Sequence, residues 1–247
     1  MSGHSKWSTI KRKKGAADSK RSKIFSRIVK EIQIATKEGG AEEENNPRLR
    51  MAILNAKGVN MPKENILRAI NKASTEGGNL QEVTFEGYAT GGVALFIECL
   101  TDNNNRTVSN IRSLFNKRGG NLGTNGSLSF IFERKGVITV PKGNLDPDDF
   151  ELEIIDAGAE DIADEGEVYV ITTSMEDFGR VRKKLEELKI EFENASLQRI
   201  PNDHKKLSKD EALKVLRIIE EFEEDDDVQN VYHNIELTDE IIAGMEG

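Results

Sequence analysis

The sequence predicts an α+β protein of three domains: an N-terminal three-helix domain and two α/β ferredoxin-like domains, the third inserted in the second. Three observations support this fold class. Apolar residues recur every three or four positions in the first 79 residues, as they do along helices. Strand-like and helix-like segments alternate from residue 80 onward. One more helix and one more strand follow the last complete unit, and the middle unit lacks this pair.

The first third of the chain is predicted to form three short helices. Ile24, Ile28 and Ile32 are spaced four residues apart, so they fall on one face of the first helix. A second helix is expected to begin at Asn46, with a proline in its first turn. A third helix is expected to open at Pro62. Glycine pairs follow the first and third helices and predict their ends.

The middle of the chain changes to the pattern of a sheet covered by helices. Residues 83–88 and 93–100 are predicted to be strands joined by a glycine turn, residues 105–117 a helix and residues 128–132 a strand. A second cycle follows. Its predicted elements are strands at 137–140, 168–173 and 195–200 and helices at 148–157 and 176–188. Such strand-helix-strand-strand-helix-strand units are typical of ferredoxin-like domains.

The C-terminal elements lead to the inserted arrangement. A helix at 209–221 and a strand at 231–237 would complete the middle unit. The predicted domains are therefore 1–79, 80–133 plus 205–247, and an insertion at 134–204. Chain order alone would also permit two sequential domains.

Charge is distributed very unevenly along the 247 residues. The formal net charge is -9, yet residues 1–37 hold eleven Lys or Arg and only two acids, a net charge of +9. Residues 80–247 carry 18 basic and 36 acidic groups, a net charge of -18. Such a chain presents a basic end to a polyanion and an acidic remainder that repels it.

Several classes of protein do not fit this sequence. No apolar run approaches the roughly 20 residues that cross a bilayer, and the basic start is not followed by the apolar stretch of a secretory signal. The single cysteine, Cys99, excludes an internal disulfide and a cysteine-based zinc site. We expect a cytoplasmic location without membrane contact, although a matrix protein whose transit peptide has been removed would look the same.

The basic start of the chain has the chemistry of a nucleic-acid contact. Lysine and arginine neutralise phosphates and release counterions, while Trp7 can stack on an unpaired base. The alternative is a solvated basic tail with Trp7 packed against the helices. The candidate binding residues in this segment are His4, Lys6, Trp7, Lys11, Arg12, Lys13, Lys14, Lys20, Arg21, Lys23 and Arg27.

Three further arginines are candidates for the same surface. Arg48 and Arg50 lie beside a predicted helix N-terminus, which is a favourable place for an anion. Simple capping with two exposed arginines explains them equally well. Arg106 lies in a polar strand-to-helix turn that can face a phosphate or a base, whereas the neighbouring Asn105 is expected to cap the helix.

No motif points to catalysis, a metal or a cofactor. The three histidines are scattered along the chain, and Cys99 lies in an apolar strand that favours an inert thiol. The glycine spacing at residues 119–123 matches an RNA-clamping loop, but it joins a helix to a strand, so a turn is the better interpretation. We therefore expect a protein that is not an enzyme, with no catalytic or metal-binding residues and no cofactor.

An acidic run occupies residues 220–227, beginning at Glu220 and ending at Asp227, with seven acids in eight positions. Acids at the end of a helix oppose its dipole, so packing or solubility must outweigh that penalty. A solvated face is the simplest interpretation. The alternative is a patch that orients the molecule on a polyanion or contacts a basic ribosomal protein.

Taken together, these residues resemble the YebC/PmpR family. The matching stretches are GHSKW at residues 3–7, NPRLR at 46–50, NMP at 60–62, FEGYATGG at 85–92, NRTVSNIR at 105–112, GGNLGTNGS at 119–127 and DDDVQNVYHN at 225–234. The resemblance implies a helical first domain, a third domain inserted in the second, and no enzymatic activity or cofactor. Members are described as DNA-binding transcriptional regulators and as ribosome-associated factors that help translation through proline runs. Mitochondrial relatives are translational activators of cytochrome oxidase.

The expected partner is a nucleic acid. The basic segment would bind RNA or DNA through the same phosphate contacts. We favour association with ribosomal RNA because no helix-turn-helix signature is present and the acidic remainder suits a bounded contact. A DNA-binding transcriptional regulator is the alternative, and an enzyme is a distant third. The sequence makes no prediction of oligomeric state.

Overall fold

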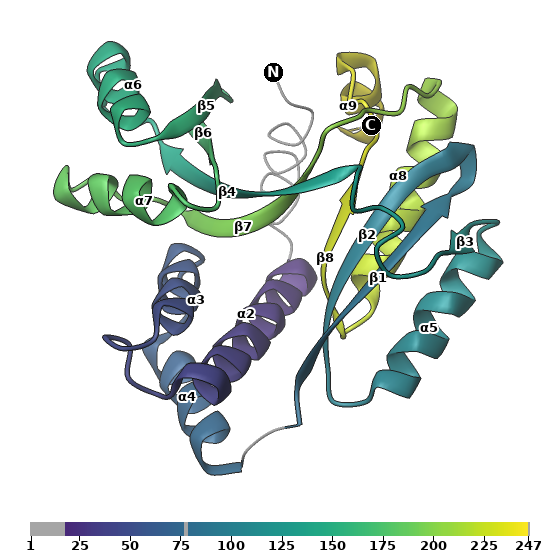
Figure 1. The fold of residues 1–247 in the computed structure, drawn as a ribbon, viewed down its shortest axis with the longest axis horizontal. Coiled ribbons are helices and arrows are strands. Elements are labelled where there is room, and N and C mark those ends of the chain that lie inside the picture. The colour runs from purple at the N-terminus through teal and green to yellow at the C-terminus, as the bar shows by residue number, and fades with distance from the viewer. Residues whose placement is uncertain (1–17, 77–78, 247) are drawn as a thin grey trace.

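A computed structural model of the chain describes residues 18–76 and 79–246 (Figure 1). The N-terminal domain consists of α2 (Asp18–Gly39), α3 (Pro47–Gly58) and α4 (Lys63–Glu76), and α2 packs against the other two helices. Its core includes Ile32, Leu49 and Ile66. The predicted three-helix bundle is thus confirmed.

One asparagine joins the first two helices. Asn46 caps α3 because its Oδ1 accepts a hydrogen bond from Leu49 N at 3.0 Å. Its Nδ2 donates to Ala35 O at 2.7 Å and to Gly40 O at 2.8 Å, which satisfies carbonyls at the end of α2. The start of one helix and the end of the other are therefore fixed by a single buried side chain.

The middle domain is a four-stranded antiparallel sheet with two helices on one face. Its strands are β1 (Gln81–Ala89), β2 (Val93–Thr101), β3 (Asn121–Leu122) and β8 (Val228–His233), in the order β3-β1-β2-β8. A short 3-10 helix, η1 (Thr90–Gly92), joins the first two strands. The helices α5 (Asn104–Lys117) and α8 (Lys209–Glu224) meet at Phe115 and Phe222, whose ring centroids are 4.8 Å apart. The C-terminal α9 (Asp239–Glu246) packs against α8.

The third domain has the ferredoxin-like order of elements. They are β4 (Phe132–Pro141), α6 (Pro147–Asp156), β5 (Ala159–Asp164), β6 (Val168–Thr173), α7 (Phe178–Glu187) and β7 (Asn194–Pro201). All neighbouring strands are antiparallel, and their order across the sheet is β5-β6-β4-β7. The core between sheet and helices includes Ile138, Ile154, Ile171 and Leu185. β7 is an edge strand of this sheet.

The third domain is inserted in the second. After β7 the chain returns to the first sheet, where β8 pairs with β2 and completes it. The middle sheet also has the ferredoxin-like strand order. Its β1 occupies the place of the third strand of that fold, although it comes first along the chain. The domain limits at 79/80, 133/134 and 204/205 remain our proposal for where the units divide.

The prediction of a strand at residues 128–132 is wrong. Residues 125–131 form turns, and the strand of this region, β4, begins only at Phe132. The reason is Glu86, whose carboxylate accepts hydrogen bonds from Gly126 N at 2.7 Å and Leu128 N at 2.6 Å. These bonds hold the backbone away from a ladder, while Leu128 is buried under the sheet.

Other predicted elements differ mainly in their limits. The last strand covers residues 228–233 instead of 231–237, and Ile235 instead forms an isolated parallel bridge with Lys205. The β5 strand and the α9 helix were not predicted, because β5 is acidic and only half-buried and α9 is short. The helices predicted at 105–117, 148–157, 176–188 and 209–221 are present.

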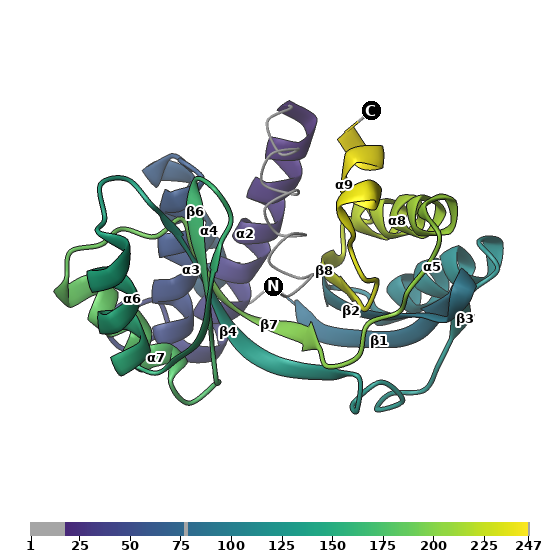
Figure 2. The same cartoon turned by 90° about the horizontal axis from the view of Figure 1, so that it is seen from above.

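The α2 helix of the N-terminal domain lies between the two α/β domains (Figure 2). Figure 2 shows the two α/β domains on either side of the molecule, with α2 between them and α3 next to the third domain. Within residues 18–76 and 79–246, no helix is long and apolar enough to cross a membrane.

Candidate nucleic-acid interface

A row of cations lies along one face of α2. Lys23, Arg27 and Lys30 are four and three residues apart, so they point to the same side of the helix. That side faces the end of α8 and the residues that follow it. Lys23 and Arg27 were predicted as binding residues, but the sequence did not place anything opposite them.

The residues opposite are Glu223 to Asp227, which we call the acidic segment (residues 223–227). Lys23 forms an ion pair with the carboxylate of Glu224 and donates to the main-chain oxygen of that residue at 3.2 Å. Arg27 Nη2 donates to Glu223 O at 2.8 Å. Lys30 Nζ donates to Asp226 O at 2.8 Å. The acids and carbonyls at the end of α8 are thus balanced by cations of the N-terminal domain.

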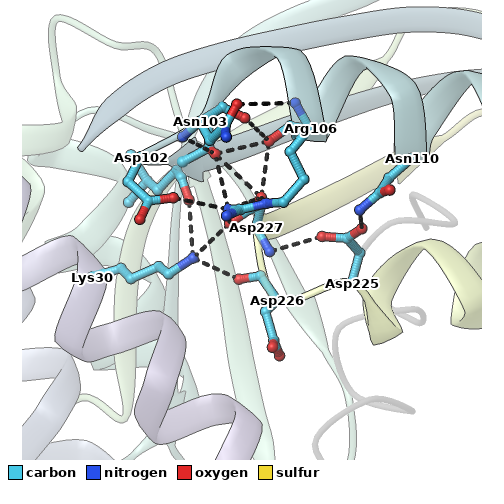
Figure 3. A network of polar contacts seen from close by, with 11 residues as sticks. Lys30, Asp102, Asn103, Arg106, Asn110, Asp225, Asp226 and Asp227 are labelled. Atoms are coloured by element: carbon cyan, nitrogen blue, oxygen red, sulfur yellow. Dashed lines mark hydrogen bonds and ion pairs between the residues drawn. The ribbon is translucent and has the colours of Figure 1, made fainter. Parts of the chain in front are cut away.

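Asp227 is the centre of this contact (Figure 3). Its side chain is only 5% exposed and accepts hydrogen bonds from Lys30 Nζ at 3.1 Å, Arg106 Nη2 at 2.7 Å and Thr107 Oγ1 at 2.8 Å. Burial raises the pKa of Asp227, but these hydrogen bonds outweigh it and hold the pKa below its ordinary value. Asp227 is therefore a carboxylate that joins α2 to the start of α5.

The Arg106 side chain binds carboxylates of the protein itself. Besides Asp227, its guanidinium binds Asp102 Oδ1 at 2.9 Å. These two carboxylates raise the pKa of Arg106. Asn103, not the predicted Asn105, caps α5 by accepting a hydrogen bond from Arg106 N at 3.1 Å.

The arginines of α3 are engaged by other residues of the protein, Arg48 by both α2 and β1. Arg48 forms ion pairs with Glu31, Glu38 and Glu82. Burial lowers the pKa of Arg48, but the hydrogen bonds and charges of Glu31 and Glu82 outweigh it and raise the pKa above its ordinary value. Arg50 donates to the carbonyls of residues 43 and 44 at 3.1 and 2.6 Å. The structure does not bring these arginines to the basic face of α2.

Arg21 is exposed near the start of α2, and its guanidinium carbon lies 5.5 Å from the centre of the Phe25 ring. Lys20 belongs to the same helix, but its side chain lies outside the described part of the structure. The remaining candidates precede the described residues, so the structure does not place them: His4, Lys6, Trp7, Lys11, Arg12, Lys13 and Lys14.

A groove of about 920 Å³ lies beside the acidic segment. Lys37 and Lys72 line it from the N-terminal domain, and Arg106, Asn110 and Asp225 line it from the middle domain. Asn110 Nδ2 donates to Asp225 Oδ2 at 3.0 Å (Figure 3). Sequence reasoning missed Lys30, Lys72 and Asn110. Only Lys30 had a signal, its spacing of seven residues from Lys23.

Two observations on the described residues concern nucleophilic catalysis and metal binding. Burial raises the pKa of Cys99 to about 12, so this thiol is protonated at neutral pH. Among the described residues, no group of three or more His, Cys, Asp and Glu is arranged to hold a metal ion.

Comparison with known proteins agrees with the fold. The family model described as the TACO1/YebC N-terminal domain matches residues 5–76, and the model described as the TACO1/YebC second and third domain matches residues 80–235. A relative from Amoebophilus asiaticus is 51% identical over 239 residues, covering 95% of this chain and 98% of its own. One from Rubrobacter xylanophilus is 46% identical over the full length of both chains. Both are named probable transcriptional regulatory protein.

A crystal structure of a conserved hypothetical protein from Aquifex aeolicus has the same fold. Its TM-score is 0.83 and its sequence identity 43%, over 91% of this chain and 94% of that one. The two family models together span nearly the whole chain, in the order of its domains. The chain therefore belongs to the TACO1/YebC family.

Proposed function

We propose that this chain is a non-enzymatic, nucleic-acid-binding regulator of gene expression that associates with ribosomal RNA. In this mode it supports translation elongation through difficult sequences such as proline runs. The observation that carries the proposal is the charge of +9 on residues 1–37, a range that includes Lys23, Arg27 and Lys30 of α2. Lysine and arginine at this density bind phosphates whatever the base sequence.

The surroundings of α2 favour a bounded contact over a long duplex. The acidic segment lies beside Lys23, Arg27 and Lys30, so a duplex that continued along α2 would meet its exposed carboxylates, Glu224 and Asp226 among them. Folded RNA in a large particle offers short stretches of backbone between other surfaces. A protein with one basic end and an acidic body fits such a place.

A DNA-binding transcriptional regulator is the second candidate. The observation that favours it is the name of the relatives, probable transcriptional regulatory protein, for proteins that are about half identical to this chain. The phosphate contacts of the basic segment serve DNA as well as RNA.

The absence of catalysis is part of the proposal. Cys99 is buried with a raised pKa, which removes the strongest nucleophile from consideration. His233 is also buried, and its Nδ1 accepts a hydrogen bond from Ile235 N at 3.2 Å, a structural role. We propose no cofactor.

Sucrose-gradient sedimentation of cell extracts tests the proposal. The protein should sediment with ribosomal particles, leave them after nuclease treatment, and leave them progressively as KCl rises. A variant with Lys11, Arg12, Lys13 and Lys14 changed to Gln should be lost from these fractions, because four phosphate contacts are removed. The matched control changes four exposed lysines of other surfaces to Gln, namely Lys183, Lys206, Lys209 and Lys214.

Two outcomes would overturn the ribosomal mode. The first is absence from ribosomal fractions together with tight, salt-dependent binding to a promoter duplex, which would establish the DNA-binding alternative. The second is sedimentation that does not change with salt or with the basic variant, which would exclude an electrostatic contact altogether.

A further inference from the structure

The acidic segment contacts α2 in the way a nucleic-acid backbone would. We propose that residues 223–227 are a built-in competitor for the basic face of α2, and that nucleic acid displaces them and releases α2 from the middle domain. This inference rests on the proposed function. It also gives the acidic run an intramolecular role in place of a contact with a ribosomal protein.

The groups that the segment offers are those of a polyanion. Lys23, Arg27 and Lys30 each donate a hydrogen bond to a main-chain oxygen of residues 223–226. Lys23 and Lys30 also pair with the carboxylates of Glu224 and Asp227. The carbonyls at the C-terminal end of α8 carry partial negative charge. Closely spaced oxygens with negative charge are also what a phosphate chain presents to lysine and arginine.

The segment is held close to its target by the fold. Because both partners belong to one chain, their effective concentration is high, and an external polyanion must compete with it. Five adjacent acids at the end of a helix repel each other and oppose the helix dipole. The α2 cations relieve that repulsion, which explains why the run is tolerated at this position.

The contact between α2 and the acidic segment is weak enough to open. The Lys23 side chain is 34% exposed and that of Glu224 is 71% exposed, so solvent and salt screen their attraction. Exposed ion pairs contribute only about 0 to 1 kcal/mol each. Among these contacts, only that of Lys30 with Asp227 involves a buried carboxylate.

A second contact would keep the N-terminal domain attached after release. Asn55 of α3 forms two hydrogen bonds with Ala195 of the edge strand β7, and Gly58 lies against the main chain at Glu193. Neither contact depends on charge. The domain can thus leave the acidic segment while it stays on the third domain.

Binding of a 20-nucleotide oligo(U) RNA gives the first test. The variant Glu223→Gln, Glu224→Gln, Asp226→Asn removes three charges from the segment and leaves buried Asp227 in place. It should bind the RNA about tenfold more tightly than the wild type, because the competitor is weakened. The slope of log K against log[KCl] should become steeper by about 1, since Lys23 no longer pairs with a carboxylate in the free protein and releases a counterion on binding, at about 0.7 per contact.

The matched control removes the same number of charges elsewhere. Glu176, Glu186 and Glu187 are exposed in and beside α7, and their change to Gln gives the same net charge. If the segment acts only through the overall field of the protein, the two variants will bind equally well, and the inference fails.

Distances between fluorescent labels give the second test. Cys99 is protonated and buried, so only introduced cysteines react at neutral pH. A pair at Ser22 and Arg217 reports on α2 against α8, and a pair at Lys57 and Glu191 reports on α3 against the third domain; all four positions are exposed. The RNA should lengthen the first distance and leave the second unchanged. KCl alone should do the same.

The outcomes separate the two proposals. RNA binding that leaves the Ser22–Arg217 distance unchanged, with equal affinities in wild type and variant, overturns the competitor and leaves the proposed function standing. Failure of both proteins to bind the RNA, with absence from ribosomal fractions, overturns the proposed function and this inference with it.

Discussion

Two contacts of the N-terminal domain with the rest of the molecule contrast most clearly, beside a further ion pair of Arg48 with Glu82 of β1. Its α3 helix meets β7 through an asparagine that pairs with main-chain groups and a glycine that allows close approach. Its α2 helix meets the acidic segment through the ends of long, charged side chains. The first contact depends on shape and is insensitive to salt, whereas the second depends on charge and is screened. One domain is therefore held by a permanent contact and a conditional one.

The largest effect is expected from Gly58→Ala. An added Cβ would lie 2.1 Å from the main-chain oxygen of Glu193, so α3 must move away from β7. Overpacking of this kind should lower the free energy of unfolding by about 3 kcal/mol, measured by urea denaturation. In the control Gly179→Ala, the new methyl group meets nothing within 4 Å, and stability should change by less than about 1 kcal/mol. Equal behaviour of the two variants would contradict the close approach.

Asp227→Asn should have the next largest effect, because it weakens the strongest part of the charged contact. Loss of charge-assisted hydrogen bonds from Lys30, Arg106 and Thr107 should lower stability by about 2 kcal/mol at neutral pH. The control is Asp226→Asn, since Asp226 is exposed and offers Lys30 its main-chain oxygen, with an expected change within about 0.5 kcal/mol.

The effect of Asp227 should also depend on pH. Its pKa is lower in the folded protein than its ordinary value, so its contribution is complete above the ordinary carboxyl pKa of about 4 and is lost as the pH falls through the lower folded value. Urea denaturation of wild type and Asp227→Asn between pH 7 and pH 2 should show the two stabilities converging in acid. A difference that persists undiminished at pH 2 would refute this origin.

Asn55→Ala tests the uncharged contact between α3 and β7. It leaves Ala195 N and O at the sheet edge without their partners at 3.0 and 3.1 Å, which should cost about 1.5 kcal/mol. The loss should be the same at 50 mM and 500 mM KCl. Asn71→Ala, at an exposed position of α4, serves as the control. A loss that shrinks with salt would mean that α3 is also held electrostatically.

The smallest effect concerns Lys23 and Glu224. A double-mutant cycle of Lys23→Gln and Glu224→Gln should give a coupling energy of about 0.5 kcal/mol at 50 mM KCl, vanishing at 500 mM. A coupling that survives high salt would show that this part of the contact is permanent as well.

The local features of the first domain could be predicted because they depend on neighbouring residues. The four-residue spacing of Ile24, Ile28 and Ile32 correctly gave a helix, and Asn46 was correctly expected to open the next one. What Asn46 does with its amide could not be predicted, because Ala35 lies eleven positions away. Hydrogen bonds at such separations depend on the packing of the two helices.

The candidate site was predicted in part for the same reason. Lys23 and Arg27 were predicted from the basic composition of their segment, but their partners lie about 200 positions along the chain. The opposite charges of the two regions, +9 at one end and seven acids near the other, were a visible signal that they attract each other. The strand expected at residues 128–132 failed because the distant Glu86 binds the main chain there.

The entry and exit of the third domain have a consequence for how such proteins are assembled. The first and last strands of the third sheet, β4 and β7, are flanked by Ile131 and Asn202, and these two residues are joined by a main-chain hydrogen bond of 2.8 Å. Phe132 and Pro201 are then partners in the first pair of β4 and β7. Because the two ends already lie side by side, the host spans no gap and pays almost no loop-closure entropy. A short turn from Ile131 to Asn202 would therefore join the two halves of the host, although Phe132 and Arg199, which pack on Phe96 of β2, would be lost with the insertion.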